Sequence, residues 1–524
     1  MELIKKNIHM MVNDKKTITQ ITLDDDMNVP DNRPDMINII ETKGDITIDE
    51  VKANDNQALV KGNLNFLVMY VGDSEERRIQ SIEGKIPLEE YIHIEDLKSG
   101  DLLKANADLE DLRIGIINSR KMSIQAIVTI EGMSEEMLEE EVSVDVAEKD
   151  GAEFWKNPME IMELRMNKKD MLRIKDEIAL PNGKNNIYEI VWKDIALNLK
   201  EIKLLSNKIN VCGSLAVFVL YRGEGDENKL EWLGEEIAFT KELECVGSSE
   251  SMIPDIKIKL KNCDMEIKAD YDGEERIIGL DAVLDVDMKL YEEEEVEIVE
   301  DIYSTSKELK PLMNKCRFNR LIGNNMAKCR ISGRMRIKGE EPRILQICNG
   351  SGKARIDNVE AEENGLAIEG TLEIQVLYVS VDDNVPFFSK MIQIPFSQHI
   401  DMNHMKENAV YKVEPGTLQI NTTMIDSEEM EVKAVLDLTV MAVEEFEKEI
   451  ICQISEEPLD FERIEDIAGI VVYMVKEGDS LWSIGKNYLL SVGDIKELNG
   501  LESDVVKKGD RLILCKNVGR QMMG

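Results

Sequence analysis

The stretch V-K-G-N-L-N-F-L-V-M-Y, residues 60–70, decides the fold that we predict for most of this chain. Its apolar side chains occupy alternate positions, and this period of two is typical of a β-strand with one buried face. One glycine, Gly62, interrupts the apolar face. Glycine within a strand marks a bulge or the close approach of a neighbouring backbone, so we expect one of these at Gly62.

The opposite face of the same stretch changes character along its length. Asn63 and Asn65 give way to Leu67 and Met69. Amide side chains are mostly exposed in folded proteins, whereas leucine and methionine are mostly buried. We therefore expect this face to be wet at the start of the strand and covered at its end.

The same pattern returns twice more without gaps, at offsets of 151 and 157 residues. The three windows begin at Pro34, Asn185 and Pro342. The matched positions are Ile39, Ile190 and Ile347; Val60, Val211 and Ile368; Gly62, Gly213 and Gly370; Leu64, Leu215 and Leu372; Val68, Val219 and Val376; Tyr70, Tyr221 and Tyr378; Ile86, Ile237 and Ile394; and Leu88, Phe239 and Phe396. So many matches at constant spacing indicate internal duplication.

Each repeat closes with a predicted β-hairpin. The turns are expected at Asn118-Ser119, Asp272-Gly273 and Asp426-Ser427, and Ala126, Ala282 and Ala434 take matching places on the strands that follow. The sequence therefore predicts a mainly β protein with three tandem domains, at about 1–150, 151–305 and 306–460, built as sandwiches or open barrels. The acidic run Glu292–Glu295 is expected to be a solvated strand end rather than a metal site.

The composition limits the class of partner. The chain has 524 residues with 64 basic and 104 acidic side chains, a net charge of −40. This charge disfavours nucleic acid and anionic membranes and would attract a basic protein surface, although it also serves plain solubility. No apolar run is long enough for a transmembrane helix. The first residues lack the apolar core of a secretion signal, so we expect a cytosolic protein.

The cysteines point to the same compartment. None belongs to a C-x-x-C pair, and the first 211 residues contain none. The eight are Cys212, Cys245, Cys263, Cys316, Cys329, Cys348, Cys452 and Cys515. We expect reduced thiols, with neither a disulfide framework nor a zinc site.

Residues for catalysis are missing. Of the four histidines, His9, His93, His399 and His404, none has a metal-ligand spacing. The stretch Asn349–Lys353 lacks the glycine frame of a phosphate loop, and Ala354 stands where that loop has serine or threonine. We find no nucleophile elbow of the form G-x-S-x-G. The sequence predicts no catalytic residue, no metal and no cofactor, and so a protein that is not an enzyme.

The last part of the chain has a different pattern. Residues 473–475 alternate as a short strand, Asp479 or Ser480 can cap a helix, and Ser491 can cap a second helix that ends at Asn499-Gly500. Residues 511–515 form a closing strand. This pattern resembles the LysM module, a β-α-α-β unit that binds N-acetylglucosamine polymers, and we assign it to residues 471–516.

The resemblance implies a ligand groove between two loops, at Gly478–Trp482 and Asn499–Ser503. Three departures from the family pattern, Gly485, the pair Leu489-Leu490 and Cys515, are expected to add exposed apolar surface near it. They favour a protein ligand over a glycan. The candidate partner-binding residues are Gly478, Asp479, Ser480, Trp482, Leu489, Leu490, Asn499 and Leu501. Trp482 lies about 100° from the core residue Leu481, so it either forms a binding hot spot or covers an edge of the module.

The order of the units resembles a family as well. Three β-rich repeats with a proline-bounded entry, seen here as Val29-Pro30 to Pro34, followed by one LysM module, resemble the SipL-type proteins with spore coat-associated (SPOCS) domains. The second repeat departs from the entry pattern at Asn185. The resemblance implies a non-catalytic scaffold of spore coat assembly, located on the mother-cell side of the forespore surface. It also implies a partner, the coat morphogenetic ATPase SpoIVA, bound partly through the LysM module, and leaves other coat proteins as further partners.

Two other functions stay open. The first is a cell-wall protein that uses the LysM module on glycan, which would need export. The second is a peptidoglycan hydrolase with an active site in one β-domain, which the shortage of histidine disfavours.

Overall fold

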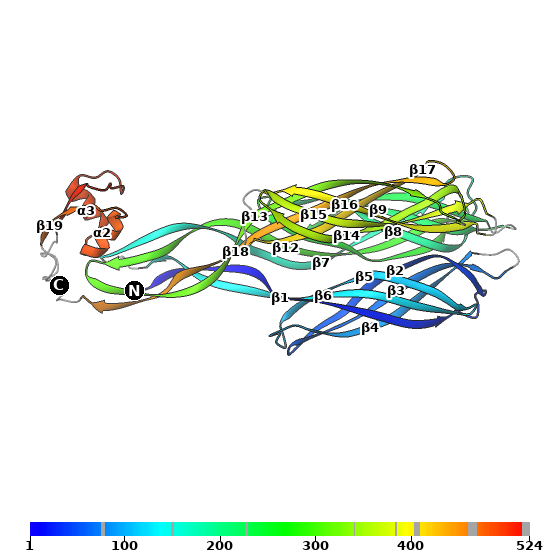
Figure 1. The fold of residues 1–524 in the computed structure, drawn as a ribbon, viewed down its shortest axis with the longest axis horizontal. Coiled ribbons are helices and arrows are strands. Elements are labelled where there is room, and N and C mark those ends of the chain that lie inside the picture. Colours follow the sequence, from blue (N-terminus) through cyan, green and yellow to red (C-terminus); the bar gives the residue numbers. More distant parts are fainter. Residues whose placement is uncertain are drawn as a thin grey trace.

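A computed structural model describes residues 1–74, 79–147, 151–225, 229–339, 341–382, 385–402, 409–459 and 469–515, with the side chains of residues 13 and 14 set aside. The chain is mainly β, as predicted, and its two described helices lie near the C-terminus. Figure 1 shows three β-sandwiches side by side, a tapering extension of their outer strands, and a small helical module beyond it.

The three repeats have the same six strands in the same order. In the first repeat they are β1 (Leu3–Asn28), β2 (Met36–Asn54), β3 (Gln57–Gly72), β4 (Ile79–His93), β5 (Leu102–Asn118) and β6 (Lys121–Val146). In the second they are β7 (Ala152–Ala179), β8 (Ile187–Leu205), β9 (Lys208–Gly223), β10 (Leu230–Glu244), β11 (Ile253–Ala269) and β12 (Glu275–Ser304). In the third they are β13 (Lys307–Arg336), β14 (Ile344–Glu362), β15 (Gly365–Ser380), β16 (Phe387–Asp401), β17 (Ala409–Met424) and β18 (Glu429–Pro458).

Each repeat is a sandwich of two three-stranded antiparallel sheets. The orders are β2-β3-β4 on β1-β6-β5, β8-β9-β10 on β7-β12-β11, and β14-β15-β16 on β13-β18-β17. The alternating stretch of residues 60–70 forms most of β3. Its apolar face packs against β6 in a single hydrophobic core. All three predicted hairpin turns lie where the last two strands of each repeat are joined, and the alanines that follow them are buried.

The conserved spacing of the three glycines reflects a close backbone approach. A Cβ added at Gly62, Gly213 or Gly370 would lie 2.3, 2.6 or 2.3 Å from a carbonyl oxygen of the neighbouring strand. In each repeat that neighbouring strand also shifts register directly beyond the glycine. Both expected features, a bulge and a close approach, are confirmed, because the bulged strand leaves no room for a side chain.

The matched tyrosines explain how the second repeat departs from the entry pattern. The hydroxyls of Tyr70 and Tyr378 donate to the carbonyl oxygens of Pro34 and Pro342, at 3.1 and 2.8 Å. Asn185 replaces that proline in the second repeat. There the hydroxyl of Tyr221 donates instead to Oε2 of Glu231, at 3.0 Å.

The far face of β3 is covered by the other repeats. Burial rises along this face from the half-buried Asn63 and Asn65 to the fully buried Met69. Met69 shares one apolar cluster with Leu220 and Leu377, which hold the matched positions of the other two repeats. The predicted change from wet to covered is confirmed, and the covering layer consists of the matched strands β9 and β15.

The outer strands of each repeat run well past its sandwich. β1, β6, β7, β12, β13 and β18 have 26–30 residues, and their far ends form three two-stranded antiparallel ribbons, β1-β6, β7-β12 and β13-β18, that pack together (Figure 1). We call this part the stalk. Its core residues are Ile8, Met10, Val142, Met159, Ile161, Val296, Ile298, Cys316, Phe318 and Ile450. The stalk ties together strands from all three repeats.

The stalk corrects one expectation. Glu292–Glu295 was expected to be a strand end, but it lies inside β12 where that strand enters the stalk. Its carboxylates are paired across strands: Glu292 and Glu294 contact Arg165, at 2.7 and 3.3 Å, and Glu294 also pairs with Lys6. The strand continues because its apolar side chains find partners on the other two ribbons of the stalk.

All eight cysteines are free in the structure. Among the described residues, no group of histidine, cysteine or carboxylate side chains could hold a metal ion. His399 lies at the surface with Glu362 and Asp401, each at 3.3 Å, whereas His404 lies outside the described residues. Within the same described ranges no helix has the length and hydropathy needed to cross a membrane.

Candidate functional site

The terminal module folds as a β-α-α-β unit. β19 (Ile470–Met474) pairs antiparallel with β20 (Arg511–Cys515), and α2 (Leu481–Tyr488) and α3 (Val492–Asn499) lie between them in the chain. Leu481, Ile484 and Leu512 form its core, at 1–2% exposure. The side chain of Ser480 accepts from the backbone N–H of Ser483 and caps α2. These are the core and cap positions that the sequence indicated.

The first loop of the groove is held by its backbone conformation and by the side chain of Asp479. Gly478 has φ +88°, a left-handed conformation that favours glycine. The carboxylate of Asp479 accepts from the backbone N–H of Lys476 and from the hydroxyl of Tyr473, both at 2.8 Å. These hydrogen bonds lower the pKa of Asp479. The loop therefore presents Gly478 and Ser480 to solvent while Asp479 supports it from within.

The second loop is pinned by Asn499. Its amide nitrogen donates to the carbonyl oxygens of Ile495 and Ile513, each at 2.8 Å, and its amide oxygen accepts from the N–H of Ile513 at 2.6 Å. Both ends of the side chain thus join α3 to β20. Leu501 follows at the loop, half-buried against the module core.

Leu490 was expected to be exposed, and that expectation is wrong. Leu489 adopts a left-handed conformation, φ 55°, and ends α2. The N–H of Leu490 then donates to the carbonyl oxygen of Gly485 at 2.9 Å, and the Leu490 side chain turns into the core with 7% exposure. Leu489 itself is half-buried.

Trp482 faces the stalk. Its ring lies 5.8 Å from that of Trp155 on β7 and 4.8 Å from that of Tyr303 on β12, between ring centroids. Its Nε1–H donates to Oδ2 of Asp301 at 2.8 Å, and Lys486 pairs with Oδ1 of Asp301 at 2.5 Å. Burial alone would raise the pKa of Asp301, but the hydrogen bonds from Lys486 and Trp482 lower it below its usual range.

Gly485 makes room for this contact. The hydroxyl of Tyr303 donates to the carbonyl oxygen of Leu490 at 2.7 Å. A Cβ on Gly485 would lie 2.5 Å from that hydroxyl and 2.8 Å from the same carbonyl. The departure at Gly485 is therefore a packing requirement of the contact between α2 and the stalk. We call this contact the docking interface, and its residues are Trp155, Asp301, Tyr303, Trp482, Gly485, Lys486 and Leu490.

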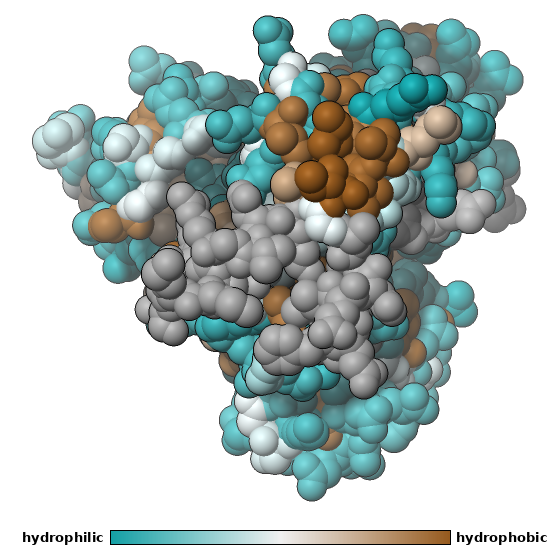
Figure 2. Space-filling model, turned by 90° about the vertical axis from the view of Figure 1, so that its left-hand side faces the viewer, coloured by the Kyte–Doolittle hydropathy of each residue, from teal (hydrophilic) through white to brown (hydrophobic). Residues whose placement is uncertain are grey.

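The sheet of the module leaves an apolar face exposed. Ile470, Val472 and Met474 of β19 and Ile513 of β20 are 69%, 67%, 57% and 44% exposed. Val472 and Ile513 are paired across the two strands. Figure 2 shows one compact hydrophobic patch at this end of the molecule. We call these four residues the sheet face; residues 470–474 are apolar throughout, so no alternation in the sequence indicates which side of β19 is exposed.

Two protein-family models match this chain. The family model described as "SipL, SPOCS domain" matches residues 19–117, 186–268 and 343–425, one segment in each repeat. The chain belongs to this SipL family. The three segments together cover half of the chain, and a LysM domain model matches residues 473–514 behind them. Both the repeat family and the module agree with the resemblances that the sequence showed.

One curated relative matches only within the LysM module. "Probable peptidoglycan endopeptidase LytE" of Bacillus subtilis (strain 168) is 50% identical over 42 residues, which are 8% of this chain. The match spans 13% of the length of LytE. No solved structure matches the chain.

Replacing Gly485 with alanine is expected to undock the module from the stalk. Alanine is favoured over glycine within a helix by about 1 kcal/mol, but its Cβ would lie 2.5 Å from the Tyr303 hydroxyl and 2.8 Å from the Leu490 carbonyl oxygen, so this preference is offset. Hydrogen exchange should therefore speed up at residues 301–304, and acrylamide should quench more tryptophan fluorescence. Gly493→Ala on α3 is the matched control, because its Cβ would meet nothing closer than 3.8 Å. Equal protection in both variants would contradict the docking interface.

Proposed function

We propose that this SipL-family protein is a non-catalytic scaffold of spore coat assembly that holds the coat at the forespore surface. Its partner in this proposal is the coat morphogenetic ATPase SpoIVA, bound at least partly through the LysM module. The family match supports a coat-associated protein, and both matched families are binding domains. We place the protein in the mother-cell cytosol, against the forespore.

The observation that carries the proposal is the module's sheet face. Large exposed apolar side chains that lie together mark an interaction site, because each would otherwise stay in contact with water. Glycan ligands, in contrast, need polar groups placed around a sugar. In the groove the Asn499 amide is already engaged on both sides and Asp479 is held by its own loop. This favours a protein surface as the ligand of the module.

The predicted partner-binding residues have different roles in this proposal. Gly478 and Ser480 are exposed on the first loop and Leu501 is half-buried on the second, and all three can touch a partner directly. Asp479, Asn499 and Leu490 act by shaping the loops, since their side chains serve internal contacts. Leu489 and Trp482 are half-buried, and Trp482 reaches a partner from the rim of the docking interface.

Peptidoglycan binding through the LysM module is the second candidate. The likeness to LytE, a probable peptidoglycan endopeptidase, favours it over the 42 matched residues. It uses the groove between the two loops rather than the sheet face. The two candidates therefore predict different sensitive residues.

Glutamate at position 482 is expected to weaken binding of the coat ATPase about 30-fold. A charge placed in a desolvated hot spot costs about 2 kcal/mol or more. Val472→Glu should weaken binding similarly, because Val472 is 67% exposed and its replacement leaves the module core intact. The measurement is a pull-down of SpoIVA by the full-length protein, with folding checked by circular dichroism.

Two controls separate binding from folding and from docking. Leu481→Glu should unfold the module outright. Asp301→Ala should release Trp482 from the stalk without changing any residue of the module. This variant should still bind the ATPase. Tight sedimentation with peptidoglycan, together with unchanged ATPase binding by folded Trp482→Glu and Val472→Glu, would replace this proposal with the wall-binding one.

A further inference from the structure

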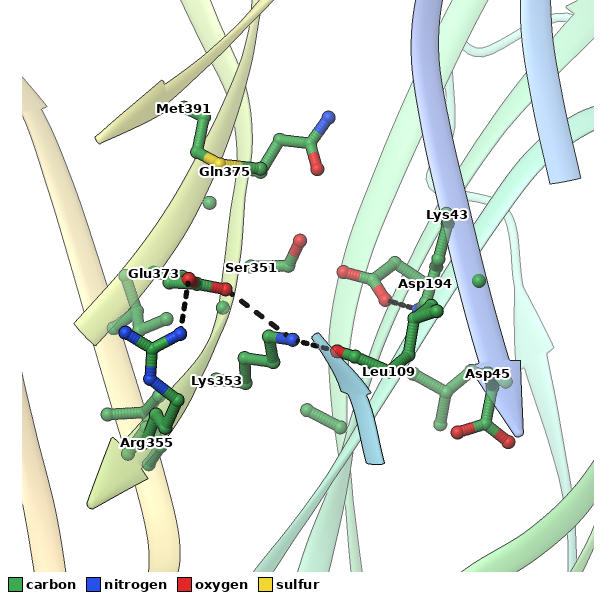
Figure 3. A pocket seen from close by; sticks show the side chains of 18 of the residues that line it. Lys43, Asp45, Leu109, Asp194, Ser351, Lys353, Arg355, Glu373, Gln375 and Met391 are labelled. Carbon is green, nitrogen blue, oxygen red and sulfur yellow. Dashed lines mark hydrogen bonds and ion pairs between the residues drawn. The ribbon is translucent and has the colours of Figure 1, made fainter. Parts of the chain in front are cut away.

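A large cleft lies between the three repeats, far from the LysM module. Its volume is about 1800 Å³. Most of its lining residues come from five strands, β2, β5, β8, β14 and β17. Each of them is an edge strand of its sheet. We call this space the central cleft, and Figure 3 shows part of its wall.

The size and the walls of the central cleft suit a polypeptide segment. Pockets for small molecules usually measure about 300–1,000 Å³, so this space is too large for one such ligand to fill. Edge strands carry backbone N–H and C=O groups that can pair with an added extended chain. A strand-like segment can therefore use the backbone of this wall as well as its side chains.

Three matched positions meet at the inner wall of the cleft. Lys43, Asp194 and Ser351 hold the same place in their repeats. The ammonium of Lys43 pairs with the carboxylate of Asp194 (Figure 3), which also accepts from the amide of Asn349 at 3.1 Å. Burial alone would raise the pKa of Asp194, but Lys43 and these hydrogen bonds lower it. The Asp194 carboxylate is thus satisfied by its own chain.

Glu41, two residues before Lys43, is not satisfied. Its side chain is 93% buried, and its Oε2 has no hydrogen-bond partner among the described residues. Burial, followed by the nearby Asp194 charge, raises its pKa to about 8. Asn198 lines the same cleft, at 9% exposure, and its Oδ1 likewise has no partner within the part of the chain that the structure describes. A buried acceptor left without a donor costs about 1–3 kcal/mol.

The net charge of the residues that line the cleft indicates which hydrogen-bond donors it attracts. The lining contains ten carboxylate side chains and six basic ones, a net charge of −4. All six basic groups are already engaged with carboxylates; Lys353, for example, contacts Glu373 at 3.4 Å and the Leu109 carbonyl at 2.5 Å, and Arg355 contacts Glu373 at 3.8 Å (Figure 3). The protein as a whole carries −40. Cationic donors are therefore attracted, and nucleic acid is repelled.

We propose that the central cleft binds an extended segment of another protein that carries lysine or arginine side chains. The segment adds to an edge strand of the wall, and its cationic side chains pair with the carboxylates that line the cleft, Glu41 among them. This second binding site is independent of the LysM module and of the partner proposed for it. It places one basic strand at the junction of all three repeats.

The test uses the full chain and a fluorescein-labelled peptide of ten residues that alternates lysine and valine. Fluorescence anisotropy at about 0.15 M salt, where long-range attraction is screened, should show binding in the micromolar range. The matching glutamate–valine peptide should not bind. Gly234→Trp should weaken binding at least tenfold, because Gly234 lines the cleft and its Cβ position has no atom within 4 Å. Gly234→Ala is the matched control and should bind normally.

At pH 9, where the Glu41 carboxylate is ionised, Glu41→Gln should weaken binding about tenfold by removing the charge while keeping the shape. Glu447→Gln, on the exposed surface of the stalk, should leave it unchanged. Binding that is equal in wild type and Gly234→Trp would place the peptide on the general acidic surface and overturn the proposal. So would equal binding of both peptides, or no binding of the lysine peptide to wild type. Each of these outcomes is independent of the pull-down with Trp482 variants.

Discussion

Replacing Glu135 with leucine is expected to lower the free energy of unfolding by about 3–5 kcal/mol at pH 7, the usual effect of breaking a buried ion pair. Glu135, on β6 of the first repeat, contacts Lys289 of the second at 2.7 Å and Lys104 at 3.0 Å. Glu135 and Lys289 are 10% and 8% exposed as side chains. Lys104 in turn contacts Asp287 at 2.5 Å. Without Glu135, the Lys289 ammonium would stay buried with no carboxylate in contact.

The loss of stability should depend on pH, and the pKa of Lys289 gives the direction of that dependence. Burial lowers the pKa of Lys289, and Glu135 partly opposes that shift. In the variant the folded-state pKa of Lys289 falls further below its unfolded value. The unfolded state then binds the proton more tightly, so stability rises with pH across that window. The loss should therefore be largest at pH 7 and smaller at pH 10.

Differential scanning calorimetry at both pH values measures the effect. Glu457→Gln removes an exposed partner of Lys310, a pair with both side chains about half exposed, and should cost at most about 0.5 kcal/mol. The double variant Glu135→Leu with Lys289→Met should recover most of the loss, because no charge then remains unpaired at the repeat junction. An equally small effect for Glu135→Leu and Glu457→Gln would show that the junction tolerates an unpaired lysine.

Replacing Glu41 with glutamine is expected to stabilise the unliganded protein at pH 9, by on the order of 4 kcal/mol, and to leave it unchanged at pH 5. The pKa of Glu41 is about 8 in the folded protein, against 4.5 for the free side chain. The folded state therefore holds the proton more tightly between these values, and stability falls as pH rises from about 4.5 to 8. Glutamine mimics the protonated form and removes that fall.

The measurement is the midpoint of thermal unfolding as a function of pH for both proteins. Glu83→Gln serves as the control, because its side chain is 71% exposed. A parallel pair of curves for wild type and Glu41→Gln would contradict a raised pKa at this site. A gain at pH 9 together with weaker peptide binding would show that Glu41 is kept for binding at the expense of stability.

The docking interface changes how the LysM module is expected to act. Trp482 was open to two interpretations, a hot spot or an edge cover; in the structure one side of its ring contacts the stalk, and the Trp482→Glu pull-down decides whether it is also a hot spot for a partner. The sheet face then lies free on another side of the module. The module is held at one place on the stalk, since Asp301 and Tyr303 make three hydrogen-bonded or ionic contacts with Trp482, Lys486 and Leu490.

Backbone conformation over a few residues could be predicted from the sequence alone. The period of two in residues 60–70, the glycines that recur at Gly62, Gly213 and Gly370, and the turn pairs such as Asp272-Gly273 report backbone geometry over a few residues. The same holds for Ser480 and Gly500 at the ends of the module's helices. Such signals depend on a residue and its near neighbours, so they identified the strands, the hairpins, the repeats and the LysM fold.

Contacts between distant segments were decided by the tertiary structure. Nothing near Gly485 in the chain predicts the Tyr303 hydroxyl that requires it, and nothing near Glu41 predicts Asp194, because these partners are more than 150 residues away. The stalk has the same origin: Glu292–Glu295 looks like a strand end until the other two ribbons supply apolar partners for the residues beyond it. Burial and pKa depend on which surfaces meet, and only the packing of the three repeats and the module determines that.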